Sequence, residues 1–432
     1  MPTPATWEHF KLLGATSGGM FALGYSQLSV VFCLLVLTDM PTTTQGYVTS
    51  ACTAGQAVSP LIFGTLSDAL GGKTTGVVVT VLSALGNIFC ALAGLFWLER
   101  DTALILGRFM VGLGIGSEMS IAAKLVKEHS CSSLGEEDML PYVVRASQLG
   151  SFLVSVVFLL ICCMGFSSDL AWRLDLGLGA VPAIAAMLLR LGLENKTDVK
   201  ARSTYMEKIR TGFESRKMQL FSFQVCVLTL STAVAGIAAA YSYKLCKDML
   251  PAFSSDRAAG IEFAIFSIVQ LIFIITGGAL TKSFESLSMP AMQTASIAGG
   301  AVVLFLGYLL SSSSMALLML FSACSLSIGA YSVCTFTIAA GILPSECTGT
   351  FMSAAAFIVL FVGAGTLAVF PGYLATYGIG PSFACGAIIL LAASVISKLL
   401  VEPDFEEGEK LPLLNKLPSE AVAPVKLKCQ DP

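Results

Sequence analysis

Long apolar stretches separated by short polar connections run along almost the whole chain. A helix that crosses a bilayer needs about 20 mostly apolar residues, and twelve stretches of the sequence meet this length. The connections contain turn-forming residues, such as TDMPTTTQG at 38–46 and SSSS at 311–314. The pattern therefore predicts an all-α membrane protein with twelve transmembrane helices. The expected spans are about 13–38, 45–69, 74–98, 101–126, 141–165, 172–191, 219–243, 257–280, 287–311, 315–341, 350–371 and 378–400.

Composition supports a membrane protein and excludes several other classes. Of the 432 residues, 55% are hydrophobic and 12% are charged, whereas a soluble domain carries about 25% charged residues. The net charge of −3 gives no indication of a nucleic-acid partner. The cysteines show no zinc-type pairing, so no metal or cofactor is expected. No catalytic arrangement of side chains is apparent, and the sequence does not predict an enzyme.

The longest charged connection between apolar stretches, at 193–218, divides the spans six plus six. A weak internal repeat agrees with this division, since SIAAKLVKE at 120–128 resembles TIAAGILPSE at 337–346. Two six-helix pseudo-repeats with a solute site between them are typical of secondary transporters. The expected divisions are an N-terminal six-helix bundle at 1–192, a cytoplasmic linker at 193–218, a C-terminal six-helix bundle at 219–401 and a disordered cytoplasmic tail at 402–432.

Lysine and arginine are concentrated in the linker and in the tail. An even number of spans places these two segments on the same side of the membrane. Because cytoplasmic connections carry an excess of Lys and Arg, both termini are expected in the cytoplasm.

The stretch Leu106–Glu128, which covers most of the fourth span, holds three ionisable residues within that span, Arg108, Glu118 and Lys124. A charge inside a spanning helix is costly unless it is paired or hydrated, so such residues often mark a solute or proton path. Lys124 is four residues from Glu128 and is expected to pair with it near the inner surface. Arg108 is always charged and cannot carry a proton. It either supports proton transfer or bonds the carbonyl groups of neighbouring helices.

Glu118 lies about 25 Å along the fourth span from Asp101, just past the midplane. A partly desolvated carboxyl at this depth could bind and release a proton as a cavity opens. The alternative is a permanent ion pair. The sequence therefore makes Glu118 the candidate for proton coupling, together with Arg108.

Other polar side chains within the spans are candidates for solute binding. Each glutamine could equally form a hydrogen bond between helices, and the tyrosine could belong to an interfacial belt. These candidates are Gln148, Tyr241, Ser332, Gln56 and Gln270. Arg173 and Asp175, at the start of the sixth span, are expected to anchor its outer boundary.

The segment GTLSDALGGK, from Gly64 to Lys73, resembles the G-x-L-x-D-x-x-G-x-[RK] signature of the major facilitator superfamily in both spacing and place. Gly64 would let helices pack closely, and Gly71 would turn the chain. Asp68 would accept hydrogen bonds from the start of the eleventh helix near Thr350 and latch the two halves together. The alternative is an ordinary capping aspartate followed by turn glycines.

Two further segments, GRFMVGLGIGSE at 107–118 and AWRLDLGLGAVPAIAAMLLRLGLE at 171–194, resemble the phosphate:proton symporter and sugar-porter branch of that family. The resemblance implies a functional acid at Glu118, a glutamine at Gln148, a tyrosine at Tyr241 and a helix 10 position at Ser332. Leu23 and Ile237 stand where that branch has carboxylates.

The resemblance implies the major facilitator fold and a monomer that moves a small polar solute with proton coupling. The expected solute is a sugar, an organic acid or an inorganic anion. A phosphate:proton symporter, a facilitative uniporter and a non-transporting scaffold or sensor are the alternatives. In the tail, EKLPLL has the spacing of an acidic dileucine signal at Glu409, Leu413 and Leu414. An adaptor protein would read it, so a plasma or an endolysosomal membrane is expected.

Overall fold

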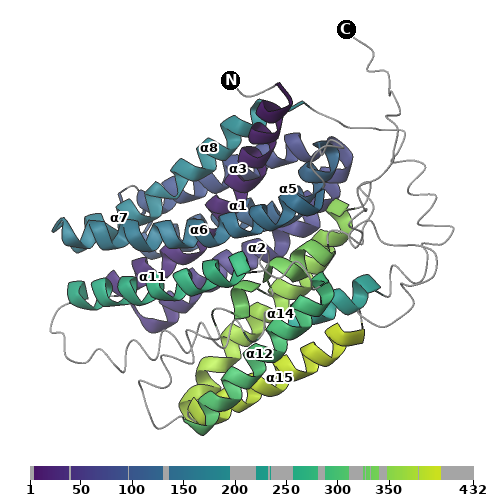
Figure 1. Cartoon of the computed structure of the whole chain (residues 1–432). Coiled ribbons are helices and arrows are strands. Elements are labelled where there is room, and N and C mark those ends of the chain that lie inside the picture. Colours follow the sequence, from purple (N-terminus) through teal and green to yellow (C-terminus); the bar gives the residue numbers. More distant parts are fainter. Residues whose placement is uncertain are drawn as a thin grey trace. The chain divides into compact units, whose positions relative to one another are not determined.

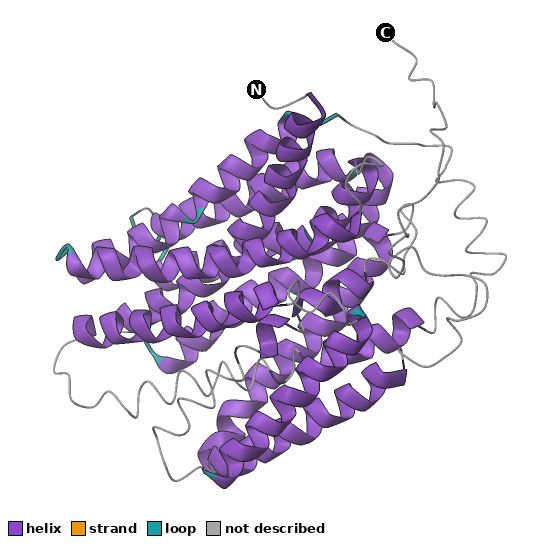
Figure 2. Cartoon of the chain, in the orientation of Figure 1, coloured by secondary structure: helices purple, strands orange, loops and turns teal. Residues whose placement is uncertain are grey.

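The computed structural model consists of helices and short connections over the part of the chain that it describes (Figure 2). No strand occurs among these residues, which agrees with the predicted all-α class. The described residues are 4–37, 40–95, 97–129, 136–194, 220–231, 234, 256–280, 288–310, 325, 327–330, 332–339, 348–377 and 379–399.

The helices of the N-terminal half match the first six expected spans (Figure 1). The fourth span is interrupted after Ile115 and the sixth at Gly179, so each is formed by two consecutive helices. Pro182 accounts for the second interruption, because proline has no N–H to donate to the carbonyl group four residues earlier. The helices are α1 (Pro4–Val36), α2 (Thr42–Leu70), α3 (Gly72–Ala91), α4 (Arg100–Ile115), α5 (Glu118–His129), α6 (Glu136–Cys163), α7 (Ser168–Leu178) and α8 (Ala180–Leu191).

In the C-terminal half, the described helices also match expected spans, although the helix Thr348–Tyr377 continues beyond the expected end at 371. Two shorter helical segments, Leu220–Ser231 and Ser327–Ala339, lie in the seventh and tenth expected spans. The labelled helices are α11 (Asp256–Leu280), α12 (Met289–Leu309), α14 (Thr348–Tyr377) and α15 (Ile379–Leu399).

Several of the described helices are long and apolar enough to cross a membrane. They are Phe10–Leu34, Gly72–Ala91, Arg100–His129, Met139–Cys163, Ser168–Leu191 and Met289–Leu309. Their outward surfaces carry large apolar side chains, among them Leu160, Leu188 and Leu309. Such side chains would be unfavourable in water and are suited to lipid. The protein is an integral, multi-pass membrane protein.

The two halves meet mainly where α2 packs on α14 and α6 packs on α11, with further contacts between α5 and α14. Figure 1 shows α14 and α11 beside these helices. One apolar cluster extends over both halves and includes Leu125, Val143, Val333 and Met352. A second cluster, with Ile297 and Leu390, belongs to the C-terminal half. A third cluster, with Phe158 of α6 and Ala264 of α11, also includes residues of both halves. The halves are therefore joined by apolar packing near both ends of α6.

Residues Met1–Val401 form one compact unit. Residues 195–219 and 400–432 lie outside the described residues. The predicted linker at 193–218, the predicted tail at 402–432 and the sorting signal at Glu409, Leu413 and Leu414 therefore stay predictions.

Candidate functional site

Glu118 forms a buried ion pair with Arg190. Glu118 begins α5, and Arg190 lies in the last turn of α8. Arg190 Nη1 donates to Glu118 Oε1 at 2.9 Å, and Nη2 donates to Oε2 at 2.5 Å. The Arg190 side chain is 0% exposed and the Glu118 side chain is 2% exposed. A paired geometry of this kind uses both oxygens of the carboxylate and is the strongest form of an arginine–carboxylate contact.

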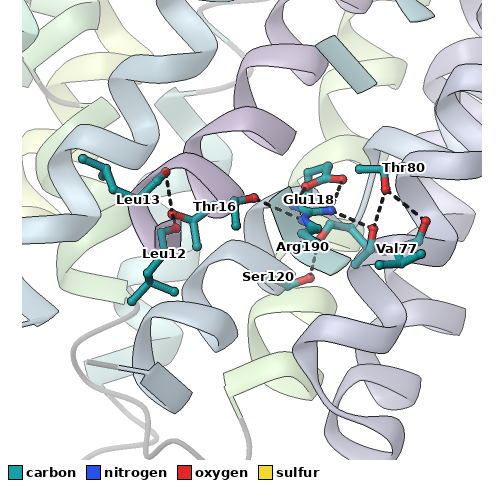
Figure 3. Close-up of polar contacts among 11 residues, drawn as sticks. Leu12, Leu13, Thr16, Val77, Thr80, Glu118, Ser120 and Arg190 are labelled. Atoms are coloured by element: carbon teal, nitrogen blue, oxygen red, sulfur yellow. Dashed lines mark hydrogen bonds and ion pairs between the residues drawn. The ribbon is translucent and has the colours of Figure 1, made fainter. Parts of the chain in front are cut away.

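The remaining donors of Arg190 connect two other helices to this pair. Its Nε donates to the Ala15 carbonyl of α1 at 3.1 Å, and Nη1 also donates to the Gly76 carbonyl of α3 at 2.8 Å. Figure 3 shows the guanidinium group between Glu118 and the helix that carries Thr80 and Val77. One side chain therefore ties α1, α3, α5 and α8 together.

The ion pair is the alternative that the sequence left open for Glu118. Arg190 was not identified as its partner from the sequence. An arginine at the end of an apolar stretch is usually read as a side chain that extends to the membrane surface. Here it is fully buried instead, because the helices around it supply an anion and two carbonyl groups.

Arg108 is also buried and bonds a neighbouring helix. Its Nη1 donates to the Ser26 carbonyl of α1 at 3.0 Å, which is the contact expected if it bonds backbone groups. Arg173 donates to the carbonyls of Ala91 and Ala93 at 2.9 and 2.8 Å, so it ties α7 to the end of α3, and its role at the outer boundary stays a prediction. The matching prediction for Asp175 is wrong, because this residue is 0% exposed. It lies on the face of α7 that also carries buried Trp172.

Asp68 holds the start of α14. Its Oδ2 accepts hydrogen bonds from the Thr350 N–H at 2.8 Å and from the Thr350 hydroxyl at 2.6 Å. The carboxylate faces a helix N-terminus, where a negative charge is favourable. Lys124 Nζ lies 3.0 Å from Asp68 Oδ1 but 3.8 Å from Glu128 Oε1. Lys124 therefore contacts its predicted partner less closely than it contacts Asp68.

The contact between Asp68 and Thr350 that the sequence predicted is thus present, and the other signature residues surround it. Gly71 has φ 89°, a left-handed conformation that favours glycine. Lys73 Nζ donates to the Leu193 carbonyl, just beyond α8. A Cβ on Gly64 would lie 2.0 Å from Ser353 Oγ and 3.0 Å from a backbone carbonyl of α14. We call the contact of α2 with α14 around Asp68 and Thr350 the latch.

Gln148 and Ser332 meet between the two halves. Gln148 Nε2 donates to Ser332 Oγ at 3.2 Å. Gln148 Oε1 is buried and has no hydrogen-bond partner in the part of the chain that the structure describes. One turn away, Arg145 of α6 donates to the Gly278 carbonyl of α11. Two of the predicted solute-binding residues therefore come together at the boundary between the halves.

Known transporters share sequence features and the fold with this protein. Residues 16–196 match a family model described as "Sugar (and other) transporter". The structure resembles the proton:xylose symporter XylE of E. coli with a TM-score of 0.72 and 14% identity, over 93% of this chain and 97% of that one. The E. coli fucose:proton symporter FucP gives a TM-score of 0.67 and 15% identity, over 90% and 98%. The fold is therefore that of the major facilitator superfamily transporters.

Curated sequence relatives of this protein are transporters rather than enzymes. A repressible high-affinity phosphate permease of Neurospora crassa is 24% identical over 48% of this chain and 43% of its own length. The glucose transporter GlcP of Staphylococcus epidermidis is 28% identical over 44% and 42%. An inorganic phosphate transporter of Toxoplasma gondii is 21% identical over 81% and 63%. The match spans less than half of the first two relatives.

The other predicted solute-binding residues that the structure describes form hydrogen bonds within one half. Gln27 Nε2 donates to Gln56 Oε1 at 3.4 Å between α1 and α2. Ser325 Oγ donates to Gln270 Oε1 at 2.5 Å within the C-terminal half. Both glutamines therefore make the interhelical hydrogen bonds that were the alternative for them. Tyr241 lies outside the described residues.

Substitution of Gly64 by alanine is expected to destabilise the protein by about 1–3 kcal/mol, the usual range for overpacking. The added methyl group would overlap the Ser353 side chain and force α2 away from α14. Gly46→Ala is the matched control in the same helix, because a Cβ there has nothing within 4 Å. Thermal unfolding of the two purified variants provides the measurement. Equal melting temperatures would show that the close approach of α2 and α14 is unimportant.

Proposed function

We propose that this protein is a secondary transporter that moves a small polar solute across a membrane by alternating access. The solute classes are a sugar, an organic acid or an inorganic anion. The fold supports this proposal, because two six-helix halves with a site between them suit rocking of one half against the other. The names of the relatives, which include phosphate and glucose transporters, support it independently.

The single observation that carries the proposal is the contact between Gln148 and Ser332. The two side chains come from different halves and bond each other directly. Gln148 Oε1 retains an unused acceptor in a buried position, and such a group is costly to leave unsatisfied. A solute that donates and accepts hydrogen bonds, such as a hydroxyl-bearing molecule or a protonated anion, would replace Ser332 and satisfy both ends of the amide.

Alternating access requires the halves to separate at one end at a time. In the present conformation Asp68 joins α2 to α14, and Ser353 Oγ of α14 donates to Ser120 Oγ of α5 at 2.9 Å. These contacts close the end of the bundle that carries the α2–α3 turn. With both termini in the cytoplasm, as we propose, this is the cytoplasmic end, and Gly64, Asp68, Gly71 and Lys73 form a conformational lock there.

We also propose that transport is coupled to protons. Glu118 stays the predicted proton carrier, and the structure defines what that role requires. A proton on Glu118 would break the paired contact with Arg190 and leave the arginine with backbone carbonyls alone. Arg108 would supply a permanent positive charge in the same bundle. A uniporter that keeps the ion pair intact throughout the cycle is the corresponding alternative.

Several relatives are named as phosphate transporters. A phosphate:proton symporter is therefore kept as a candidate. Against it, Leu23 and Ile237 replace carboxylates expected in that branch. A scaffold or sensor without transport is the candidate from another class. We propose the plasma membrane or an endolysosomal membrane as the location, a monomer as the working unit, and an adaptor protein as the partner of the tail.

The test is tracer uptake by purified full-length protein in proteoliposomes under an imposed pH gradient. The probes are inorganic phosphate, glucose, xylose and inositol. We expect uptake of at least one solute, and we expect Gln148→Ala to reduce that uptake at least tenfold. The control is Gln45→Ala, which removes one side-chain bond to the Met40 carbonyl at the start of α2. No uptake of any probe by the wild type would favour the scaffold alternative.

A further inference from the structure

Asp175 is a buried acid that the transport proposal does not use. It lies on α7 and is 0% exposed, next to the buried apolar residues Trp172 and Leu176 of one core cluster. Neither oxygen of its carboxyl group has a hydrogen-bond partner among the described residues. Asp175 is fifteen residues before Arg190 along α7 and α8, about 22 Å if the two helices are nearly collinear. It is therefore far from the ion pair of Glu118.

The groups around Asp175 include one cation, Arg108 of α4, whose charge acts on it. Arg108 directs Nη1 to the Ser26 carbonyl, and its Nε has no partner in the described part of the chain. From α1, Tyr25 donates to the backbone carbonyl of Asp175 at 3.4 Å rather than to its carboxyl group. Asp175 and Arg108 are thus bonded to adjacent residues of α1, Tyr25 and Ser26. The Arg108 Nε donor and the Asp175 carboxyl group, both without a hydrogen-bond partner among the described residues, lie in the same buried region.

The other titratable groups of this region are thiols or are already bonded. Cys33 of α1 lies near Asp175, and Cys52 of α2 and Cys90 of α3 lie near Arg108. On α7 itself, Arg173 is bonded to Asp169 and to the backbone after α3. The helices α6 and α8 also pack on α7. Of their arginines, half-buried Arg145 donates to the Gly278 carbonyl and buried Arg190 donates to Glu118.

An ionised carboxylate is very unfavourable in such a place, because no donor replaces the water it has lost. A carboxyl group in this position takes up a proton instead. Glu118 differs, since two N–H groups of Arg190 satisfy its ionised form. The two acids of the N-terminal half are therefore expected in opposite charge states.

We propose that Asp175 is a proton-binding site of this protein, with Arg108 as the cation that receives its carboxylate. In the present conformation Asp175 is the neutral acid and Arg108 bonds the Ser26 carbonyl. When α7 and α4 approach, the O–H bond of Asp175 breaks, the proton passes to water, and the carboxylate accepts hydrogen bonds from Arg108. The reverse movement restores the proton. This inference rests on the proposed transport function for its role in coupling, but the protonation state itself does not.

The first test is infrared absorption of the purified full-length protein in lipid at neutral pH. We expect the wild type to show the carbonyl band of a protonated carboxyl group. Asp175→Asn should remove this band, whereas Glu118→Gln should keep it. Asp175→Glu is the second variant and should shift the band. A wild type without the band, or a band that neither change at Asp175 alters, would overturn the proposal.

The second test is uptake in proteoliposomes with the four solutes named above. Asp175→Asn is expected to lose at least tenfold of the accumulation driven by a pH gradient while it keeps exchange of solute across the membrane. Unchanged accumulation together with loss of the infrared band would overturn the coupling role. If the wild type shows the band but transports none of the solutes, the transport proposal fails, whereas the assignment of Asp175 as a protonated acid is retained.

Discussion

Glu118→Gln is expected to destabilise the protein by about 3–5 kcal/mol, the usual cost of removing one partner of a buried ion pair. The substitution leaves the Arg190 guanidinium fully buried, with carbonyl groups but no anion. Thermal and denaturant unfolding of the purified protein measure the effect. Asp169→Asn is the matched control, because it breaks the ion pair of Arg173 with a carboxylate that is 67% exposed. Exposed pairs contribute about 0–1 kcal/mol.

The double variant Glu118→Leu, Arg190→Met distinguishes a structural pair from a proton carrier. Removal of both charges is expected to restore most of the stability, since apolar replacements of buried ion pairs are often neutral. If Glu118 carries the proton, this stable variant loses uptake driven by a pH gradient but keeps exchange. Unchanged concentrative uptake would remove Glu118 from the coupling role and leave the ion pair as a structural element. A single variant as stable as the wild type would contradict the assigned contact.

Asp68→Asn is expected to raise the rate of amide hydrogen exchange at Thr350 by about tenfold to a hundredfold. The Thr350 N–H donates to a charged carboxylate at 2.8 Å, and a hydrogen bond to a charged group contributes about 1.5–3 kcal/mol. The substitution also removes the carboxylate that lies 3.0 Å from Lys124 Nζ, whereas the Glu128 carboxylate lies 3.8 Å away. Because the bond joins the two halves, its loss favours opening of the latch.

Hydrogen exchange followed by mass spectrometry measures this effect in the peptides that contain Thr350. Asp101→Asn is the control, since Asp101 pairs with the adjacent Arg100 and the carboxylate side chain is 24% exposed. It should leave exchange at the latch unchanged. Protection of Thr350 that survives Asp68→Asn would show that the apolar packing of α2 on α14, rather than the charge, keeps this end closed.

The transmembrane architecture and the latch could be predicted because each depends on local sequence. An apolar stretch of about 20 residues must form a helix in lipid, where no water satisfies the backbone. The signature from Gly64 to Lys73 specifies a helix end, a left-handed turn and an acid at set spacings. The partner of Asp68 at Thr350 followed from the family arrangement that this signature resembles.

The partners of the buried charges could not be predicted in the same way. Glu118 and Arg190 are 72 residues apart, and Gln148 and Ser332 are 184 apart. Asp175 was predicted at a boundary and is buried instead. A helix that is apolar on every side has no stripe that reveals which face turns inward. The sequence determined that these polar groups lie within the membrane, and only the rotation and packing of the helices decided which of them meet.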